Sequence, residues 1–124
     1  MPTMTGGQAL VAALKAEGIE VIFGLPGVQI MHIFDALYNE PEISLITTRH
    51  EQATTFMADG YARISGKVPA ALVVPGPGVL NAGAGLATAY ANSSPMLLVS
   101  GQVPSTDIGR DVDEWSPKSL ARCR

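Results

Sequence analysis

The sequence has 124 residues, close to the usual size of one domain, and 47% of them are hydrophobic, which is enough for one substantial core. The formal net charge of -3, with Lys and Arg scattered along the chain, argues against a nucleic-acid partner. No apolar run is long enough to cross a bilayer and the N-terminus does not resemble a secretory signal, so we expect a soluble, cytoplasmic protein that does not bind membranes.

The first half of the chain alternates between helix and strand patterns. A capping box that begins at Thr5 predicts a helix that runs to about Gly18. The β-branched and aromatic run Val21–Phe23 predicts a buried strand, and Ile43–Thr47 predicts a second strand. Between them lies a helix that must end before Pro41, because proline disfavours helical geometry in the residue before it. The apolar positions of this helix are Ile30, Ile33, Phe34 and Leu37.

The second half of the chain repeats this alternation. Helical spacing resumes at His50 and continues to a glycine stop at Gly66. The side chains of this helix expected to face the core are Ala53, Phe56, Met57 and Tyr61. Ala70–Val74 predicts a third strand, and Met96–Val99 predicts a fourth. The helix predicted between them, Val79–Tyr90, is rich in glycine and alanine, which allows it to pack closely on a neighbour.

Continuous apolar strands that alternate with helices are typical of parallel βαβ units, because strands covered on both faces lose the polar alternation of a half-exposed sheet. The sequence therefore predicts an α/β fold with a doubly wound, mostly parallel sheet and helices on both faces. We expect residues 1–109 to form the N-terminal portion of an incomplete domain. The composition then becomes polar, so residues 110–124 are expected to form a surface loop and an atypical C-terminal tail.

Glu51 is the first candidate for a functional residue. It lies between the strand Ile43–Thr47 and the helix that follows, and ligands of open α/β sheets bind just beyond the carboxyl ends of the strands. A carboxylate at a helix start has a second explanation, because the partial positive charge of the first turn favours acidic residues there. The position of Glu51 alone does not decide between these explanations.

The turn Gly76–Asn81 is the second candidate. It lacks the third glycine of a dinucleotide-binding turn, since Asn81 stands at that position, and the sequence contains no Gly-Lys-Ser/Thr triplet of a P-loop. Glycines that open a helix can let the backbone approach a ligand, and they can equally serve close packing.

Four motifs together resemble one protein family in their order, spacing and context. They are Gly24-Leu25-Pro26-Gly27, Arg49-His50-Glu51-Gln52, Ala58-Asp59-Gly60-Tyr61-Ala62-Arg63 and Gly76-Pro77-Gly78-Val79-Leu80-Asn81. From about Thr5 to Gly109 the sequence resembles the N-terminal, pyrimidine-binding domain of thiamine diphosphate-dependent enzymes, in the branch of acetolactate synthase and benzoylformate decarboxylase. The four motifs together are much more specific than any one of them.

The resemblance implies functions for individual residues. Glu51 corresponds to the catalytic glutamate that hydrogen-bonds the aminopyrimidine ring nitrogen of thiamine diphosphate and shares a proton with it. The other cofactor-binding residues that it implies are Pro26, Gly27, Gly76, Gly78 and Asn81. The substrate-side candidates that it implies are Val28, Gln29, Gln52 and Phe56. Turn, core or capping roles remain open as alternatives for these residues.

Three further polar features are assigned no direct chemistry. His50 is expected to act at the helix start rather than as a catalytic base, and His32, within an apolar helix, is expected to be partly buried and structural. Asp59 and Arg63 have the i, i+4 spacing of an ion pair on one helix.

Full-length members of the family carry a second domain that binds the diphosphate through magnesium, held by a Gly-Asp-Gly segment and a downstream asparagine, and neither motif occurs here. The resemblance therefore implies half of a cofactor site, no metal ligand in this chain, and no activity of the chain alone. The partners that it implies are a complementary diphosphate-binding domain, a small 2-keto acid substrate and further copies of the chain in a homo-oligomer, and FAD is a possible cofactor of the full-length family. The expected reaction is 2-keto acid carboligation or decarboxylation; the alternative is a non-catalytic α/β interaction module on the same scaffold.

Overall fold

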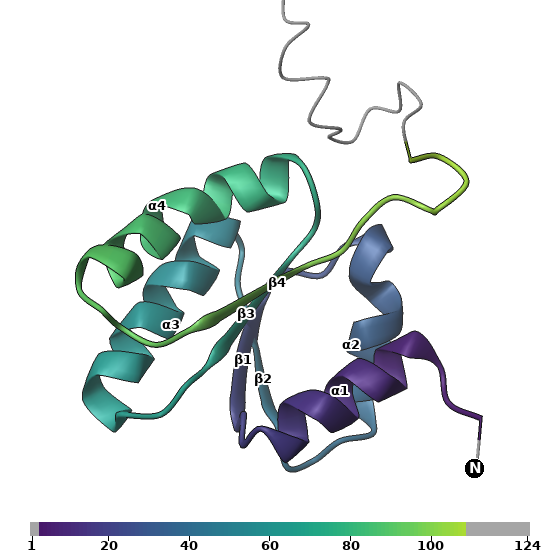
Figure 1. The fold of residues 1–124 in the computed structure, drawn as a ribbon, viewed down its shortest axis with the longest axis horizontal. Coiled ribbons are helices and arrows are strands. Elements are labelled where there is room, and N and C mark those ends of the chain that lie inside the picture. The colour runs from purple at the N-terminus through teal and green to yellow at the C-terminus, as the bar shows by residue number, and fades with distance from the viewer. Residues whose placement is uncertain (1–2, 109–124) are drawn as a thin grey trace, which may run out of the picture.

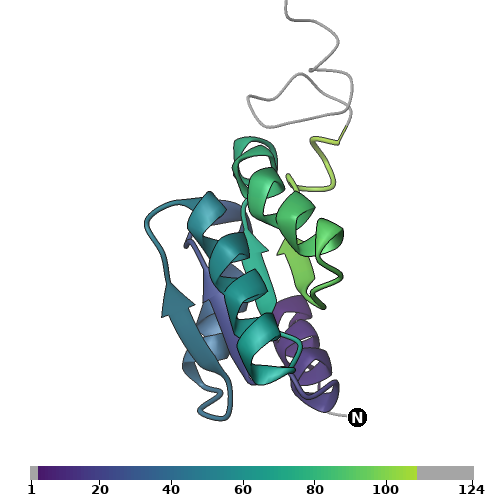
Figure 2. The ribbon, with the colours of Figure 1, turned by 90° about the vertical axis from the view of Figure 1, so that its left-hand side faces the viewer.

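The computed structural model describes residues 3–108, which form a four-stranded sheet with helices on both faces (Figure 1). The strands are β1 (Val21–Gly24), β2 (Ser44–Thr47), β3 (Ala70–Val73) and β4 (Leu97–Ser100), arranged in the order β2-β1-β3-β4. Every pair of neighbouring strands is parallel, and the arrowheads in Figure 2 point the same way. The predicted α/β fold with a doubly wound parallel sheet is confirmed. The predicted tail, residues 110–124, lies outside the described residues.

The helices form one layer on each face of the sheet. α1 (Gly6–Ala16) and α2 (Met31–Tyr38) pack against each other on one face, and α3 (Glu51–Ser65) and α4 (Pro77–Ala91) pack on the other (Figure 1). A short 3-10 turn, η1 (Val28–Ile30), precedes α2. No helix within residues 3–108 combines the length and the apolar character needed to cross a bilayer.

The order of the strands places a reversal of direction between β1 and β3. α2 carries the chain from β1 to β2 on one face of the sheet, and α3 carries it back past β1 to β3 on the other face. The carboxyl ends of β1 and β3 therefore lie at the topological switch point, where ligands bind in sheets of this kind.

Local signals determine where the helices begin and end. At the start of α1 the Thr5 hydroxyl accepts a hydrogen bond from the Gln8 backbone N–H (3.2 Å), and the Gln8 side chain accepts one from the Thr5 N–H (2.9 Å), which confirms the capping box. α3 ends at Gly66, whose φ of 70° is a left-handed conformation that glycine adopts without strain. α4 begins with Pro77, and the N–H that proline lacks would have no acceptor within the helix at this position.

The core lies on both faces of the two central strands. On the α1 and α2 face it includes Val11, Leu14, Ile22, Ile30, Leu37 and Leu72. On the other face the ring of Phe23 meets Tyr61 edge-on, with 6.2 Å between the ring centres. β1 and β3 are buried, whereas in β2 Ile46 is 40% exposed and in β4 Leu97 is 41% exposed. The apolar runs therefore overstate the burial of β2 and β4, because these are the outer strands of the described sheet.

The buried face of α3 differs from the prediction. Phe56 and Met57 were expected to face the core, but each is 41% exposed. Ala53 and Tyr61 are half-buried. The buried side chains of this helix are Thr54, Thr55, Ala58, Asp59 and Ala62. The prediction was wrong because α4 approaches α3 so closely that only short side chains fit between the two helices.

α4 meets α3 through its small residues. A Cβ at Gly85 would overlap the Thr55 hydroxyl and would lie 2.7 Å from the backbone nitrogen of Phe56. Thr55 Oγ1 donates a hydrogen bond to the Ala82 carbonyl oxygen at 2.9 Å, so a side chain of one helix is bonded to the backbone of the other. The predicted close packing is confirmed for Ala82 and Gly85, whereas Gly83 on the same helix has open space around it.

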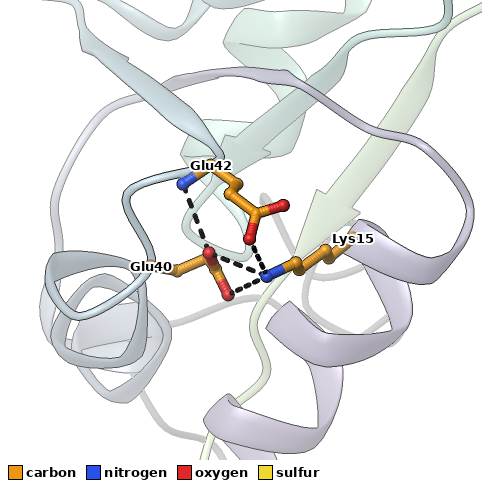
Figure 3. A network of polar contacts seen from close by, with 3 residues as sticks. All are labelled: Lys15, Glu40 and Glu42. Carbon is orange, nitrogen blue, oxygen red and sulfur yellow. Dashed lines mark hydrogen bonds and ion pairs between the residues drawn. The ribbon is translucent and has the colours of Figure 1, made fainter.

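An ion-pair cluster holds the opposite end of the sheet. Lys15 Nζ, at the end of α1, lies 3.2 Å from Glu40 and 2.7 Å from Glu42, in the segment that leads into β2 (Figure 3). The hydrogen bonds to Glu42 and then to Glu40 raise the pKa of Lys15. The pKa of Glu40 is lowered, first by the backbone N–H of Glu42 and then by Lys15. The cluster therefore favours the charged forms of Lys15 and Glu40.

Candidate functional site

Three connecting segments come together at the carboxyl ends of the strands. Residues 25–28 follow β1, residues 48–51 lead from β2 into α3, and residues 74–78 lead from β3 into α4. Because β1 lies between β2 and β3 in the parallel sheet, these segments lie at the same edge. The structure therefore brings the motifs around Pro26, Glu51 and Gly78 to one end of the molecule.

Glu51 is the first residue of α3, and its side chain is half-buried. Asn81, in the first turns of α4, donates a hydrogen bond from its side-chain nitrogen to Glu51 Oε2 at 3.0 Å. This bond joins two residues that are 30 positions apart in the sequence and lie on neighbouring helices. Two of the predicted site residues are thus in direct contact.

The backbone around Glu51 is held by several hydrogen bonds. His50 is the N-cap of α3, and its Nδ1 accepts a hydrogen bond from the Gln52 N–H at 3.1 Å. The Thr48 hydroxyl donates to the His50 carbonyl oxygen at 3.2 Å, and the buried Thr54 hydroxyl donates to the Glu51 carbonyl oxygen at 2.6 Å. The prediction that His50 acts at the helix start is confirmed, whereas the threonines were not singled out from the sequence.

The two glycine turns meet at the side chain of Val74. A Cβ at Gly27 would overlap Val74 Cγ1, and a Cβ at Gly78 would lie 2.7 Å from Val74 Cγ2. Gly76 has a φ of 64°, a conformation that side-chain-bearing residues rarely adopt. Close packing and backbone conformation therefore explain these glycines without a ligand, which is one of the two explanations that the sequence left open. Val74 was missed as a site residue, although its place at the end of a predicted strand, directly before the turn, marks it in the sequence.

Gly78 also leaves space beside the carboxylate. A Cβ at this position would lie 3.6 Å from Glu51 Oε1, the oxygen that Asn81 does not contact. Among the described residues, Oε1 receives no hydrogen bond. The carboxylate thus has one oxygen that accepts a hydrogen bond from an amide and one oxygen, on the side of the glycine turn, without a hydrogen bond from the described residues.

An apolar cavity of about 340 Å³ adjoins the turn after β1. It is lined by Pro26, Gly27, Val28, Met31 and Phe34. Val28 is 74% exposed at its rim. Gln29 is half-buried in η1, and Gln52 and Phe56 are exposed on α3. The structure therefore groups Val28 with Pro26 and Gly27 but places Gln52 and Phe56 outside this cavity. Phe34 was predicted only as an apolar position of a helix, and Met31 was not singled out from the sequence.

The remaining polar candidates have structural explanations. His32 was expected to be partly buried, but it is exposed, although its backbone carbonyl group lies against Gly7 of α1. The predicted pair of Asp59 and Arg63 is confirmed at 2.7 Å, and Arg63 holds the pKa of the buried Asp59 below its usual range. Within residues 3–108, no three His, Cys, Asp or Glu side chains gather as they would around a metal ion.

Comparison with known protein families gives a match over nearly the whole chain. The family model described as thiamine pyrophosphate enzyme, N-terminal TPP binding domain, matches residues 4–121. This range includes all the residues of the site described above.

Several curated relatives are similar to the chain at close to half of the aligned positions. The acetolactate synthase large subunit of Haemophilus influenzae is 48% identical over 111 residues, which cover 90% of this chain and 19% of the relative. The probable acetolactate synthase large subunit of Methanocaldococcus jannaschii is 46% identical over 108 residues, covering 87% of this chain and 18% of the relative. The acetolactate synthase isozyme 3 large subunit of Escherichia coli is 43% identical over 111 residues, covering 90% and 19%. The chain therefore spans about a fifth of the length of these relatives.

Proposed function

The chain belongs to the family of N-terminal TPP binding domains of thiamine pyrophosphate enzymes, and from this premise we propose that Glu51 is the residue that activates the cofactor. The single observation that carries this proposal is the state of its carboxylate. One oxygen accepts a hydrogen bond from Asn81 and the other has none from the described residues, at the carboxyl edge of the parallel sheet. A carboxylate that only stabilised the start of α3 would need neither the hydrogen bond from Asn81 nor an oxygen without a partner.

The residues around Glu51 fit a flat heterocycle with a basic nitrogen. The missing side chain of Gly78 leaves room beside Oε1, and the neighbouring Val74 and Pro26 are apolar. When bound, thiamine diphosphate supplies a nucleophilic carbon that adds to a keto carbonyl and takes up the electrons left by the loss of carbon dioxide. The part of Glu51 is to share a proton, at Oε1, with the ring nitrogen of the aminopyrimidine. A side-chain amide at this position could not share that proton.

The other candidate residues have supporting roles in this proposal. Asn81 orients the carboxylate, and Gly76 and Gly78 let the backbone of the second turn lie close to the heterocycle. Pro26 and Gly27 form the wall on the β1 side. The residues proposed to face the substrate are Val28 and Gln29, next to the apolar cavity, and Gln52 and Phe56, on the exposed side of α3.

We further propose that the chain is the N-terminal portion of a 2-keto acid carboligase or decarboxylase of the acetolactate synthase type. The identities of 43 to 48% to acetolactate synthase large subunits support this assignment. A diphosphate-binding domain would complete the site together with its magnesium ion, so residues 1–109 alone are expected to be inactive. Apolar side chains exposed on α3 and α4, among them Phe56, Met57 and Leu80, offer a surface for that domain or for a second copy of the chain.

The proposal is tested by the variant Glu51→Gln, with a complementary diphosphate-binding domain supplied in trans. The rate of deuterium exchange at the thiazolium carbon of bound thiamine diphosphate is measured by NMR. We expect the exchange to slow by about 100-fold or more, the usual contribution of a positioned acid or base. Binding of thiamine diphosphate, measured by calorimetry, should change far less.

Glu17→Gln is the matched control, because it removes an exposed carboxylate at the end of α1, at the opposite end of the sheet from Glu51. Its exchange rate should equal that of the wild type. Unchanged exchange in Glu51→Gln would refute the proposed role of Glu51.

A further inference from the structure

The cap of α3 depends on the protonation state of one imidazole. His50 has the extended backbone of an N-cap residue, with φ -158° and ψ 140°, and its Nδ1 lies 3.1 Å from the Gln52 backbone nitrogen. A backbone N–H can only donate, so Nδ1 must present its lone pair and the ring proton must reside on Nε2. The cap therefore requires a neutral His50.

Protonation of the ring would remove this cap for two reasons. A proton on Nδ1 would face the Gln52 N–H, placing a donor against a donor, and the resulting cation would stand at the positive end of the α3 dipole. Helix starts favour anions, so the contact between two donors and the cation both destabilise the first turn of α3.

The charged groups that flank His50 in the chain have opposite signs. Its chain neighbours are Arg49, which is cationic, and Glu51, whose carboxylate accepts a hydrogen bond from Asn81 at one oxygen only. The elements packed against α3 are β1, β3 and α4. Their only ionisable side chain is Tyr90, in the last turn of α4 and far from the cap. Protonation of the ring therefore removes the hydrogen bond that caps α3.

The cap acts on Glu51 through the first turn of the helix. Glu51 lies between the capping residue and the residue whose N–H is capped, so the path of its backbone is fixed from both sides. A first turn that frays would carry its carboxylate away from the side chain of Asn81, which is held on a different helix.

We propose that His50 is a positioning residue: while neutral it holds the first turn of α3 and thereby the Glu51 carboxylate beside Asn81, and its protonation releases both. Only the effect of His50 on catalysis rests on the proposed function of Glu51. The structural part, a cap that histidine titration opens and closes, holds for the chain itself.

The variant His50→Asn separates capping from titration. Asparagine is among the best N-cap residues, so its side-chain oxygen can accept the Gln52 N–H, but it does not titrate. His50→Ala removes both properties. His32→Asn is the matched control, because it replaces the other histidine of the sequence, which is exposed on α2.

The measurement follows two NMR signals of the full chain from pH 8 to pH 5, the range in which histidines usually titrate. The first is the protection factor of the Gln52 amide against hydrogen exchange, and the second is the side-chain amide resonance of Asn81. In the wild type we expect the protection to fall by about 2- to 30-fold, the range that corresponds to loss of an N-cap, and the Asn81 signal to shift with the midpoint of the His50 ring. In His50→Asn both signals should stay constant, and His32→Asn should behave like the wild type.

Two results would overturn the proposal. One is a Gln52 protection factor in the wild type that does not change as the His50 ring titrates. The other is an equal loss of protection in His50→Asn, which would assign the effect to another group. If His50→Ala does not fold, His50→Asn alone still decides between these outcomes. Neither signal needs the cofactor, so a failure of the proposed role of Glu51 would appear only in the thiazolium exchange experiment and would be recognised separately.

Discussion

The spacing of α3 and α4 leads to a prediction about two glycines of the same helix. Gly85 and Gly83 both lie in the interior of α4, where replacement of glycine by alanine ordinarily stabilises a helix. A Cβ at Gly83 would meet nothing within 4 Å, whereas a Cβ at Gly85 would overlap Thr55 Oγ1 and lie 2.7 Å from the Phe56 nitrogen. Gly83→Ala and Gly85→Ala are therefore chemically identical changes in opposite environments.

The expected sizes follow from two opposing effects. Alanine favours a helix over glycine by about 1 kcal/mol, and Gly83→Ala should gain this amount of unfolding free energy in full. Overpacking costs about 1 to 3 kcal/mol, and the cost at Gly85 should lie toward the upper end because a backbone nitrogen cannot rotate away. Gly85→Ala should therefore be up to about 2 kcal/mol less stable than the wild type. The gap between the two variants is the overpacking cost itself.

The assay is urea unfolding followed by circular dichroism at 222 nm, with the slope of the transition checked for constancy across the variants. Thermal unfolding gives a second measure, at about 4 to 8 °C per kcal/mol for a domain of this size. Equal stability of Gly85→Ala and Gly83→Ala would refute the close packing of α4 on α3. That result would also remove the reason for Asn81 to reach Glu51, since the same spacing sets both contacts.

Two further predictions concern the turn packing and the response to acid. Gly27→Ala should destabilise the chain by about 1 to 3 kcal/mol, because its Cβ would overlap Val74, and adding Val74→Ala should recover most of this loss in urea unfolding; no recovery would contradict the contact. The lowered pKa of Glu40 means that its contribution to stability is present above its unfolded value of 4.5 and is lost as the pH falls through the lower folded value. Glu40→Gln should therefore unfold at a lower urea concentration than the wild type at pH 7, and the difference should shrink as the pH falls below 4.5; equal midpoints at pH 7 would show that the cluster of Figure 3 does not stabilise the chain.

Features that depend on neighbouring residues could be predicted from the sequence. The hydroxyl of Thr5 and the side chain of Gln8 cap α1 because they are three positions apart, and Gly66 ends α3 because glycine alone adopts its backbone conformation without strain. The apolar runs of β1 and β3 predicted buried parallel strands because strands covered on both faces have no polar side to display. These signals also place Glu51 at a strand end and a helix start.

Features that depend on distances across the fold were decided by the tertiary structure. The apolar spacing of α3 indicated Phe56 and Met57 as core residues, but the buried face consists of short side chains, because the approach of α4 depends on the sizes of residues on both helices. The same approach brings Asn81 to Glu51, which no local pattern in either helix encodes.

The sequence by itself thus determined the type and order of the elements and the residues that resemble a cofactor site. The tertiary structure alone decided that one oxygen of Glu51 is bound by Asn81 while the other has no hydrogen bond from the described residues, and that both glycine turns pack on Val74. The physical reason is that a helix cap forms between residues close together in the chain, and that the burial of a strand is favoured by the apolar character of the strand as a whole. A hydrogen bond between two helices depends instead on their separation to within a fraction of an ångström, which only the packing of the whole domain sets.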